Sequence, residues 1–194
     1  DPQTRQRENL RIESEIQVIE ILFEGTKAVG VVALQHGREH TFKANEVILC
    51  SGAIHSPAML LRAGIGPVGH LHDMGIEVRL ERAGVGQNLM EHAAAAMSAW
   101  MQPDARLNDL TQRHIHLGWR YSSNMHHAPA GDMFAAVVAK SAWHAVGDRL
   151  GSMLAWVNKT YSTGQLTLTS SDWRVEPTVE FNMLSDARDL DRLM

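Results

Sequence analysis

Hydrophobic positions in the first part of the chain fall into short runs separated by polar turns. The runs are rich in Ile and Val, and the turns contain glycine or polar residues, a pattern typical of β-strands. We expect strands over residues 9–14, 16–24, 27–34, 40–45 and 46–50. The last of these, EVILC, is continuously apolar after Glu46, as is typical of a strand buried on both faces. The pattern therefore predicts a β-meander that leads into one core strand.

The hydrophobic period changes after this strand, where two short helices are expected. Ser56 can cap the first helix, Pro57 suits its first position, and Gly64 follows its end. The second helix begins near Pro67 and stops at Gly75. Both assignments rest on start and stop signals as well as on the apolar spacing.

Strand-like runs return in the rest of the chain. Residues 76–80 predict a short strand and residues 83–92 a glycine-rich loop. The alanine-rich stretch 93–101 suits a helix by propensity, but it follows a loop and precedes Pro103, so we favour a strand. Residues 105–131 are polar and rich in histidine, and predict a loop with a short helix. Further strands are expected over residues 132–140, 153–159, 164–170 and 177–182, and a helix begins within the last ten residues.

Together these elements predict an α+β protein built from parts of two domains. Residues 1–92 are expected to contain the β-meander, the core strand and the short helices. Residues 93–194 are expected to form a mainly antiparallel sheet with helices. The predicted boundary lies between residues 92 and 93.

Composition narrows the classes of function. Of the 194 residues, 44% are hydrophobic and 21% are charged, which is ordinary for a soluble globular protein. The net charge of −4 argues against a nucleic-acid partner. No apolar stretch approaches the ~20 residues of a membrane-spanning helix. The single cysteine, Cys50, lies in an apolar run, so we expect a buried, inert thiol and a reducing, cytoplasmic location.

The hexapeptide GIGPVG, from Gly64 to Gly69, spells the G-x-G-x-x-G pattern of a dinucleotide-binding loop. Such a loop needs a strand before its first glycine and a helix after its last, so that free amides face the pyrophosphate. Here a helix precedes Gly64, and Pro67 lacks one of the amides. We therefore interpret Gly64 as a helix C-cap and reject an NAD-dependent dehydrogenase, which would rest on this hexapeptide alone.

A longer stretch, GAIHSPAMLLRAGIG over residues 52–66, resembles the second signature of the glucose–methanol–choline (GMC) family of flavin oxidoreductases. Every constrained place matches except Ala63, where the family usually has Ser. Residues 9–34, 83–92 and 162–193 resemble further segments of the family, with Glu91 in place of an Asp. The resemblance is weakest over residues 93–150 and is closest to bacterial choline dehydrogenase-like and alcohol dehydrogenase-like members.

The resemblance implies FAD as cofactor and the oxidation of a choline-like or other primary alcohol by hydride transfer to the flavin. In the family, a His assists removal of the hydroxyl proton. Nothing in this sequence resembles that His motif or the true phosphate loop. We therefore expect a middle segment of a bacterial flavoenzyme, inactive by itself and without a catalytic residue of its own. The alternative is a non-catalytic β-rich binding module that binds no flavin. The sequence sets no oligomeric state.

Cofactor contacts are implied for a small set of positions. They are Val18, Ser51, Gly52, Ala53, Asn88 and His92. Val18 falls where the family's strand holds adenine through its backbone, and Gly52 permits a close approach of backbone to the adenosine moiety. Asn88 and His92 fall in a loop that lies near the flavin in the family. For His92, a hydrogen bond that anchors the loop is the favoured alternative.

The histidine-rich region raises the question of a metal site. His114 and His116 would share a strand face, as two zinc ligands can, and His126 adjoins His127. No cysteine or acidic residue completes a ligand set, so we expect no metal. In the family this region shapes the substrate cavity. The tryptophans that could line it, although a core position is favoured for each, are Trp100, Trp119 and Trp143.

Overall fold

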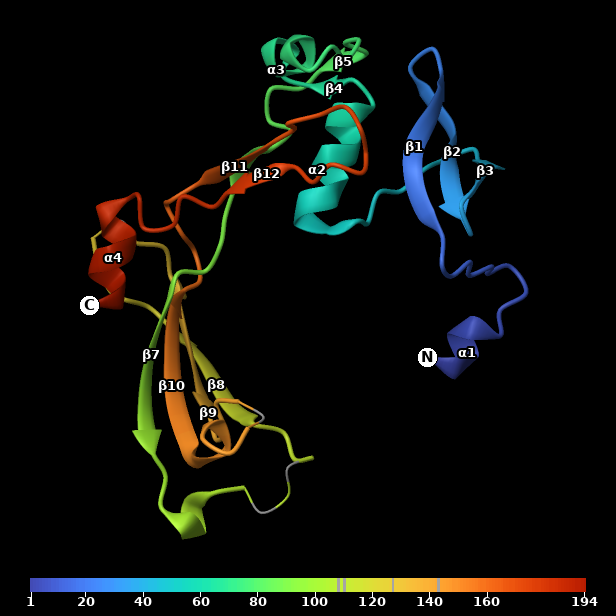
Figure 1. The fold of residues 1–194 in the computed structure, drawn as a ribbon. Coiled ribbons are helices and arrows are strands. Elements are labelled where there is room, and N and C mark those ends of the chain that lie inside the picture. Colours follow the sequence, from blue (N-terminus) through green and yellow to red (C-terminus); the bar gives the residue numbers. More distant parts are fainter. Residues whose placement is uncertain (108, 110, 127, 143) are drawn as a thin grey trace. The chain divides into compact units, whose positions relative to one another are not determined.

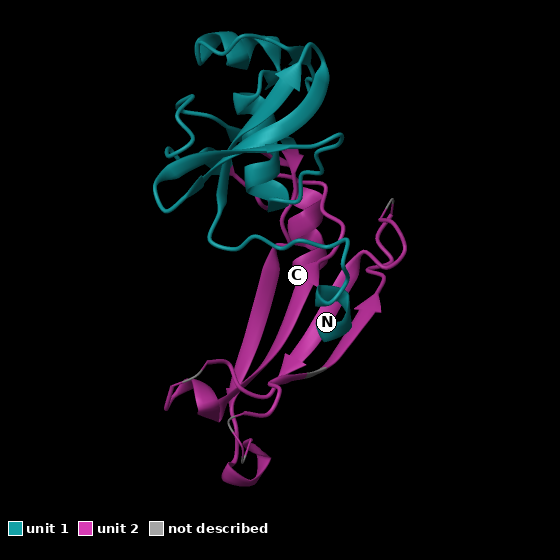
Figure 2. Ribbon diagram, turned by 90° about the vertical axis from the view of Figure 1, so that its right-hand side faces the viewer, with its two compact units in different colours: residues 1–87, 166–179 teal, residues 88–165, 180–194 magenta. Residues whose placement is uncertain are grey.

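The computed structural model describes residues 1–107, 109, 111–126, 128–142 and 144–194, with only the backbone of His116. The chain divides into two compact units (Figure 2). Unit 1 comprises Asp1–Gln87 and Leu166–Val179, and unit 2 comprises Asn88–Gln165 and Glu180–Met194. Strands in several sheets and a few helices form them, which confirms the predicted α+β class. The domain boundary after residue 92 stays a prediction.

Unit 1 begins with the predicted β-meander (Figure 1). After the short helix α1 (Pro2–Arg5), strands β1 (Gln17–Glu24), β2 (Lys27–Gln35) and β3 (Arg38–Lys43) pair antiparallel in that order. The turns use left-handed backbone at Gly25, with φ of 61°, and at Gly37, with φ of 76°. Residues 9–14 form no strand, because no described strand lies beside them to take their backbone hydrogen bonds.

The expected core strand at residues 46–50 is wrong for this chain. These residues form neither a helix nor a strand, Ile48 is 77% exposed, and the Cys50 thiol is exposed rather than buried. An apolar run becomes a buried strand only where neighbouring strands supply hydrogen bonds and cover its faces. None of the described residues does so here.

Helix α2 (Gly52–Arg62) begins earlier than the sequence predicts. Pro57 therefore lies inside the helix, and Ser56 is not its cap. The Ser56 hydroxyl instead accepts a hydrogen bond from the Ser51 backbone N–H at 3.0 Å. The predicted end is confirmed, because Gly64 has a φ of 79° and its N–H donates to the Leu61 carbonyl at 2.9 Å.

The second predicted helix is confirmed as α3 (Val68–Asp73), with Pro67 as N-cap and Gly75 in the left-handed region behind it. The two-residue strands β4 (Ile65–Gly66) and β5 (Leu80–Glu81), which precede and follow α3 in the chain, pair in parallel with each other. The buried core under both helices consists of Ala58, Leu61, Leu71, Leu166 and Leu168. Segments distant in sequence therefore share one core in unit 1.

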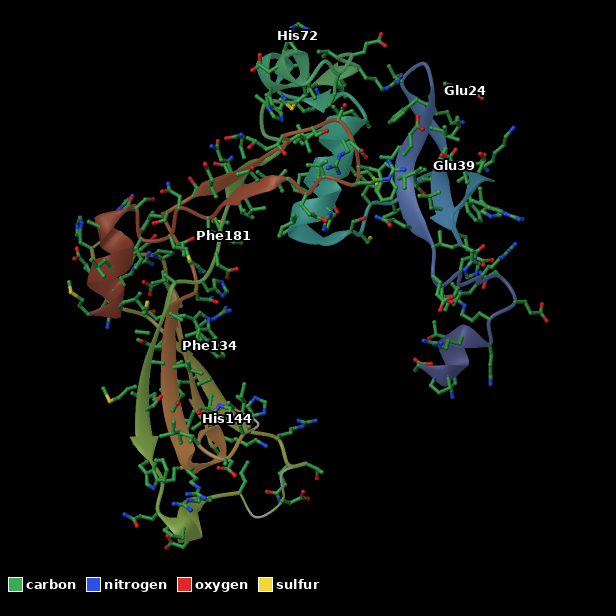
Figure 3. All side chains as sticks on the ribbon, viewed as in Figure 1. Glu24, Glu39, His72, Phe134, His144 and Phe181 are labelled. Atoms are coloured by element: carbon green, nitrogen blue, oxygen red, sulfur yellow. The ribbon has the colours of Figure 1, made fainter. Side chains whose placement is uncertain are left out.

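Unit 2 is built on the antiparallel sheet β7-β10-β9-β8, as predicted for the second half of the chain. Its strands are β7 (Ala94–Trp100), β8 (Ile115–Tyr121), β9 (Met133–Val138) and β10 (Leu150–Val157), with 3₁₀ turns η1 (Pro103–Ala105) and η2 (Gly147–Arg149). Phe134, which is labelled in Figure 3, lies on β9. Its ring stacks on that of Trp156 in β10, with centroids 4.7 Å apart. The loop expected over residues 105–131 is wrong at β8, because backbone pairing with β9 makes it a strand.

Three short strands contain the points where the chain passes between the units. They are β6 (Gln87–Leu89), β11 (Gly164–Thr167) and β12 (Thr178–Glu180), ordered β12-β11-β6. The final helix, α4 (Ala187–Leu193), is capped by Asp186, whose carboxylate accepts from the Arg188 N–H at 3.0 Å. Helix α4 thus confirms the helix expected at the end of the sequence.

Candidate functional site

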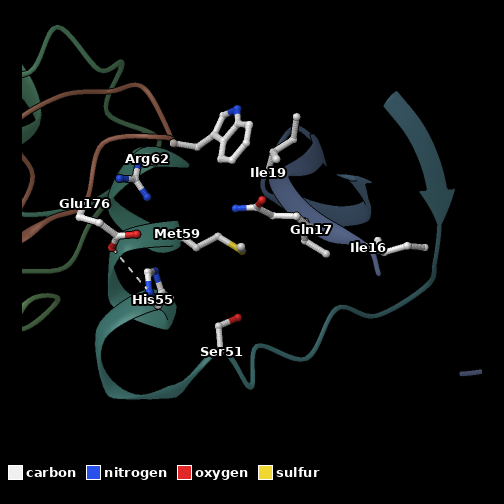
Figure 4. Close-up of a pocket in the computed structure, with 10 residues that line it drawn as sticks. Ile16, Gln17, Ile19, Ser51, His55, Met59, Arg62 and Glu176 are labelled. Carbon is white, nitrogen blue, oxygen red and sulfur yellow. Dashed lines mark ion pairs between the residues drawn. The ribbon is translucent and has the colours of Figure 1, made fainter. Parts of the chain in front are cut away.

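A hollow of about 450 Å³ lies in unit 1 between the start of β1 and one face of α2 (Figure 4). Its lining residues are Ile16, Gln17, Val18, Ile19, Ser51, His55, Met59, Arg62, Trp173 and Glu176. They come from three parts of the chain: the first strand, the first long helix and a segment near residue 175. We call this hollow the α2 pocket.

One wall of the α2 pocket is a single face of helix α2. Ser51, His55, Met59 and Arg62 line it, and their spacing of three or four residues places them on one side of a helix. Ser51 lies just before the helix, and its N–H is already bonded to Ser56. The wall therefore combines polar groups with the apolar Met59 side chain.

The opposite wall is the edge of strand β1. In the order β1-β2-β3, no described strand pairs with the outer edge of β1. A sheet edge presents backbone N–H and C=O groups that are free to bind a partner. Val18, 36% exposed, lies on this strand beside the α2 pocket. The strand can therefore offer both a donor and an acceptor to a flat polar ligand.

The third wall is residues 170–177, which follow β11 within unit 1; we call them the return segment. It places Trp173 and Glu176 at the pocket. Two side chains of α2 hold the segment: Arg62 Nη2 donates to the Val175 carbonyl at 2.7 Å, and His55 Nε2 lies 3.7 Å from the Glu176 carboxylate. The wall is thus tied to the helix it faces.

Arg62 contributes a positive charge to the lining of the pocket. Burial lowers the pKa of its guanidinium, and the carboxylates of Glu176 and Asp172 partly offset this. Arginine guanidinium groups in proteins stay charged at neutral pH. Its Nε atom is buried and makes no hydrogen bond to any described residue. The N–H at Nε of Arg62 is therefore a spare donor.

The predicted cofactor contacts fall in both units. Val18 and Ser51 line the α2 pocket, and Gly52 and Ala53 open the adjoining helix. Gly52 has a φ of 83°, and nothing lies within 4 Å of the place of a Cβ, so its backbone is open to approach. Asn88 lies on β6, in unit 2. These roles stay predictions.

His92 also belongs to unit 2, and it is exposed. Its backbone N–H donates to the Glu91 carboxylate at 2.7 Å. This bond involves the backbone and not the imidazole, so the anchoring role considered for the His92 side chain stays a prediction.

Several lining residues went unnoticed at the level of sequence. They are Ile16, Gln17, Ile19, His55, Met59, Arg62, Trp173 and Glu176. The spacing from Ser51 to Arg62 carried a signal, since it marks one helix face. No sequence signal relates Trp173 and Glu176 to α2, because more than a hundred residues separate them and only the fold brings them together.

The remaining expectations concern metal and aromatic residues. Among the described residues, no group of three or more His, Cys, Asp or Glu side chains could hold a metal. His127 and Trp143 lie outside the described residues. Trp100 is 56% exposed and Trp119 is 38% exposed, so the favoured core positions for these two are wrong. Both lie on strands of the unit 2 sheet, where their rings are accessible.

None of the described helices is long and apolar enough to cross a bilayer.

Comparisons with known proteins extend the sequence resemblance. The family model of the GMC oxidoreductases matches residues 2–94. 5-(Hydroxymethyl)furfural oxidase of Methylovorus sp. (strain MP688) is 41% identical over 100% of this chain and 36% of its own length. Oxygen-dependent choline dehydrogenase of Staphylococcus saprophyticus is 33% identical over 94% of this chain and 37% of its own.

Solved structures show the same fold. Formate oxidase aligns with a TM-score of 0.85 and 19% identity over 97% of this chain and 42% of its own. Pyridoxine 4-oxidase from Mesorbium loti aligns with a TM-score of 0.80 and 21% identity over 100% of this chain and 39% of its own. The chain thus spans well under half the length of these proteins.

The structural likeness, the family model and the whole-chain relatives agree. GMC oxidoreductases are FAD-dependent, so the expected cofactor is confirmed at the level of the family. The resemblance seen in the signature at residues 52–66 is confirmed, and this chain belongs to the GMC oxidoreductase family.

Proposed function

We propose that this chain is part of an FAD-dependent oxidoreductase that oxidises the CH–OH group of an alcohol. The observation that carries the proposal is the α2 pocket. In it, the strand expected to hold adenine faces the Ser51–Ala53 turn expected to approach the adenosine moiety. Membership of the GMC family supports the same conclusion.

The α2 pocket suits the adenosine end of FAD in its chemistry. Adenine is a flat ring whose edge carries both donors and acceptors, which complements the free edge of β1 at Val18. Its faces need apolar cover, which Ile16, Met59 and Trp173 can provide. The open space at Gly52 leaves the backbone accessible. The residues present therefore fit this part of the cofactor.

The residues of this chain bind and orient; they do not themselves transfer hydride. When bound, FAD supplies the hydride acceptor. We assign to the Val18 backbone the holding of adenine, and to Ser51, Gly52 and Ala53 the close approach to adenosine. Asn88 and His92 are proposed to lie toward the flavin. No residue of this chain is assigned the removal of the hydroxyl proton.

The proposed substrate is a small primary alcohol. The relative that acts on 5-(hydroxymethyl)furfural is 41% identical across the whole chain, whereas the choline dehydrogenase is 33% identical over 94% of it. This difference supports a hydroxymethyl group on a ring ahead of choline. A cytoplasmic, bacterial setting is part of the proposal, supported by the bacterial origin of these relatives.

We further propose that the 194-residue chain is inactive by itself, since it corresponds to only 36% of the length of the furfural oxidase. The test titrates the purified chain with FAD, follows flavin fluorescence, and assays oxidation of 5-(hydroxymethyl)furfural and choline. We expect FAD binding without turnover. Turnover of either alcohol would contradict the inactivity.

A glycine pair makes the binding test specific. Gly52→Ala adds a side chain at a φ of 83°, which strains the turn and should weaken FAD binding about fivefold or more. Gly84→Ala is the control, because a Cβ there meets nothing within 4 Å and its φ is not left-handed. A chain that folds but binds no FAD would instead favour the non-catalytic binding module.

A further inference from the structure

The return segment, residues 170–177, is the feature of the α2 pocket that no cofactor signature assigns. We propose that it is a strap over the adenosine moiety of FAD, with Trp173 packing against the adenine ring. The proposal rests on the proposed function, because it takes the α2 pocket as the adenosine site. It adds the residues that close this site and the way they are held.

The strap is fastened to α2 at two points. Arg62 Nη2 donates to the Val175 carbonyl at 2.7 Å, and the His55 imidazole lies 3.7 Å from the Glu176 carboxylate. The second pair is largely exposed, so it contributes less than the first. Both contacts come from the helix wall of the pocket, so they hold the strap beside that wall.

The strap also holds its own shape. The Asp172 N–H donates to Ser170 Oγ at 3.1 Å, and the Asp172 carboxylate accepts from the Arg174 N–H at 3.0 Å. The Arg174 guanidinium lies 4.7 Å from the centre of the Trp173 ring. These contacts limit the motion of the half-buried Trp173 side chain, which lines the pocket.

Adenine is the part of FAD that this arrangement recognises. Stacking of a base on an aromatic side chain is strong, and it tolerates the absence of specific edge contacts. Trp173 can supply the stacking surface while the β1 edge at Val18 reads the edge of the base. The spare Nε donor of Arg62 is a further polar group in the same wall. Together these groups favour a ligand that combines a flat base with hydroxyl or phosphate oxygens.

The test measures dissociation constants of the 194-residue chain for FAD and for ADP, which shares the adenosine moiety, by titration calorimetry. Trp173→Ala should weaken the binding of FAD and of ADP about tenfold, because it removes the stacking ring. Arg62→Met should weaken the binding of both ligands about fivefold, because it frees the strap from α2. Trp173→Phe keeps a stacking ring and should stay within about twofold of the wild type. The controls are Trp100→Ala, in unit 2, and Arg82→Met, which loses a side-chain hydrogen bond to the neighbouring Glu81 carbonyl and keeps the backbone bond to Gly66.

Circular dichroism and denaturant midpoints establish that each variant is folded. Trp173→Leu, which keeps apolar bulk without a ring, replaces the alanine variant if that variant unfolds. If folded Trp173→Ala and Arg62→Met bind FAD and ADP as tightly as the wild type does, the strap is overturned and the proposed function still stands. If the wild-type chain binds neither FAD nor ADP, both the strap and the proposed function are overturned. Simultaneous binding of FAD and ADP also overturns the assignment, because one pocket holds one adenosine.

Discussion

At the scale of single residues, the glycines of GIGPVG are not equivalent. Gly64 has a φ of 79°, and a Cβ there would lie 2.2 Å from the Glu77 carbonyl oxygen. A Cβ on Gly66 would lie 2.5 Å from Leu61 Cδ2. Gly69 lies in helix α3, where a Cβ meets nothing within 4 Å. The hexapeptide is therefore a helix end followed by close packing, not a phosphate loop.

This difference predicts opposite effects of alanine within the hexapeptide. Gly64→Ala should destabilise the protein by about 2 kcal/mol or more, because it combines left-handed strain with a backbone clash. Gly69→Ala should be neutral or stabilising by up to about 1 kcal/mol, because alanine favours a helix. Equilibrium unfolding in urea measures both. Equal effects would contradict this explanation of Gly64.

At the scale of elements, Arg79 connects the β1–β2 hairpin to the helical part of unit 1. Arg79 Nη1 donates to the carbonyl of Gly25, at the hairpin turn, at 3.1 Å. Its guanidinium also lies 4.5 Å from the centre of the Phe23 ring. Since β1 forms one wall of the α2 pocket, this contact helps to fix that wall.

Removing this contact should loosen the hairpin and leave unit 2 unchanged. Arg79→Met loses the hydrogen bond and the cation–π contact to the hairpin, together about 1 kcal/mol, or roughly fivefold in local opening. It also loses the longer hydrogen bond from Arg79 Nε to the Ala63 carbonyl, at 3.4 Å, outside the hairpin. Hydrogen exchange should be faster by about that factor in β1 and β2. The matched control is Arg82→Met. Unchanged exchange in the hairpin of Arg79→Met would show that other contacts hold it.

At the scale of the whole chain, unit 2 is closed by a buried ionic network around Arg192. This residue of α4 pairs with Asp132, which lies just before β9, at 3.1 Å, and with Asp189 of its own helix. Burial alone would raise the pKa of Asp132, but hydrogen bonds from Ser123 and Arg192 outweigh it and hold the pKa below its usual value. The pKa of Asp189 is lowered against burial in the same way, by Ser162, Tyr161 and Arg192.

Lowered carboxylate pKa values predict a loss of stability in acid. The stabilisation is fully present above the unfolded pKa of about 4 and is lost as the pH falls toward the lower folded values. The melting temperature should therefore drop between about pH 4.5 and pH 3. Asp132→Asn should reduce this dependence, while Asp191→Asn, exposed on the same helix, should not. A wild-type melting temperature that is constant across this window would contradict the prediction.

Much of the fold follows from local patterns that the tertiary structure leaves intact. The meander, helix α3, the stop at Gly64 and the antiparallel strands of unit 2 were all predictable, because glycine turns and apolar spacing act over a few residues. The strands expected at residues 9–14 and 46–50 did not form, and β8 formed where a loop was expected. These differences depend on which strands are present to pair, which no local pattern records.

For the site, the sequence by itself determined the family, through a signature at residues 52–66, and with it the cofactor class and the strand and turn where adenosine is expected. Only the tertiary structure decided that β1 and α2 face each other across a pocket. It also decided that residues 170–177 contribute Trp173 and Glu176 to the lining of that pocket and contact α2 through Arg62 and His55. The physical reason is the distance along the chain over which residues interact. Signatures and turns depend on residues that are neighbours in sequence, whereas a pocket forms by packing between segments that are far apart in sequence.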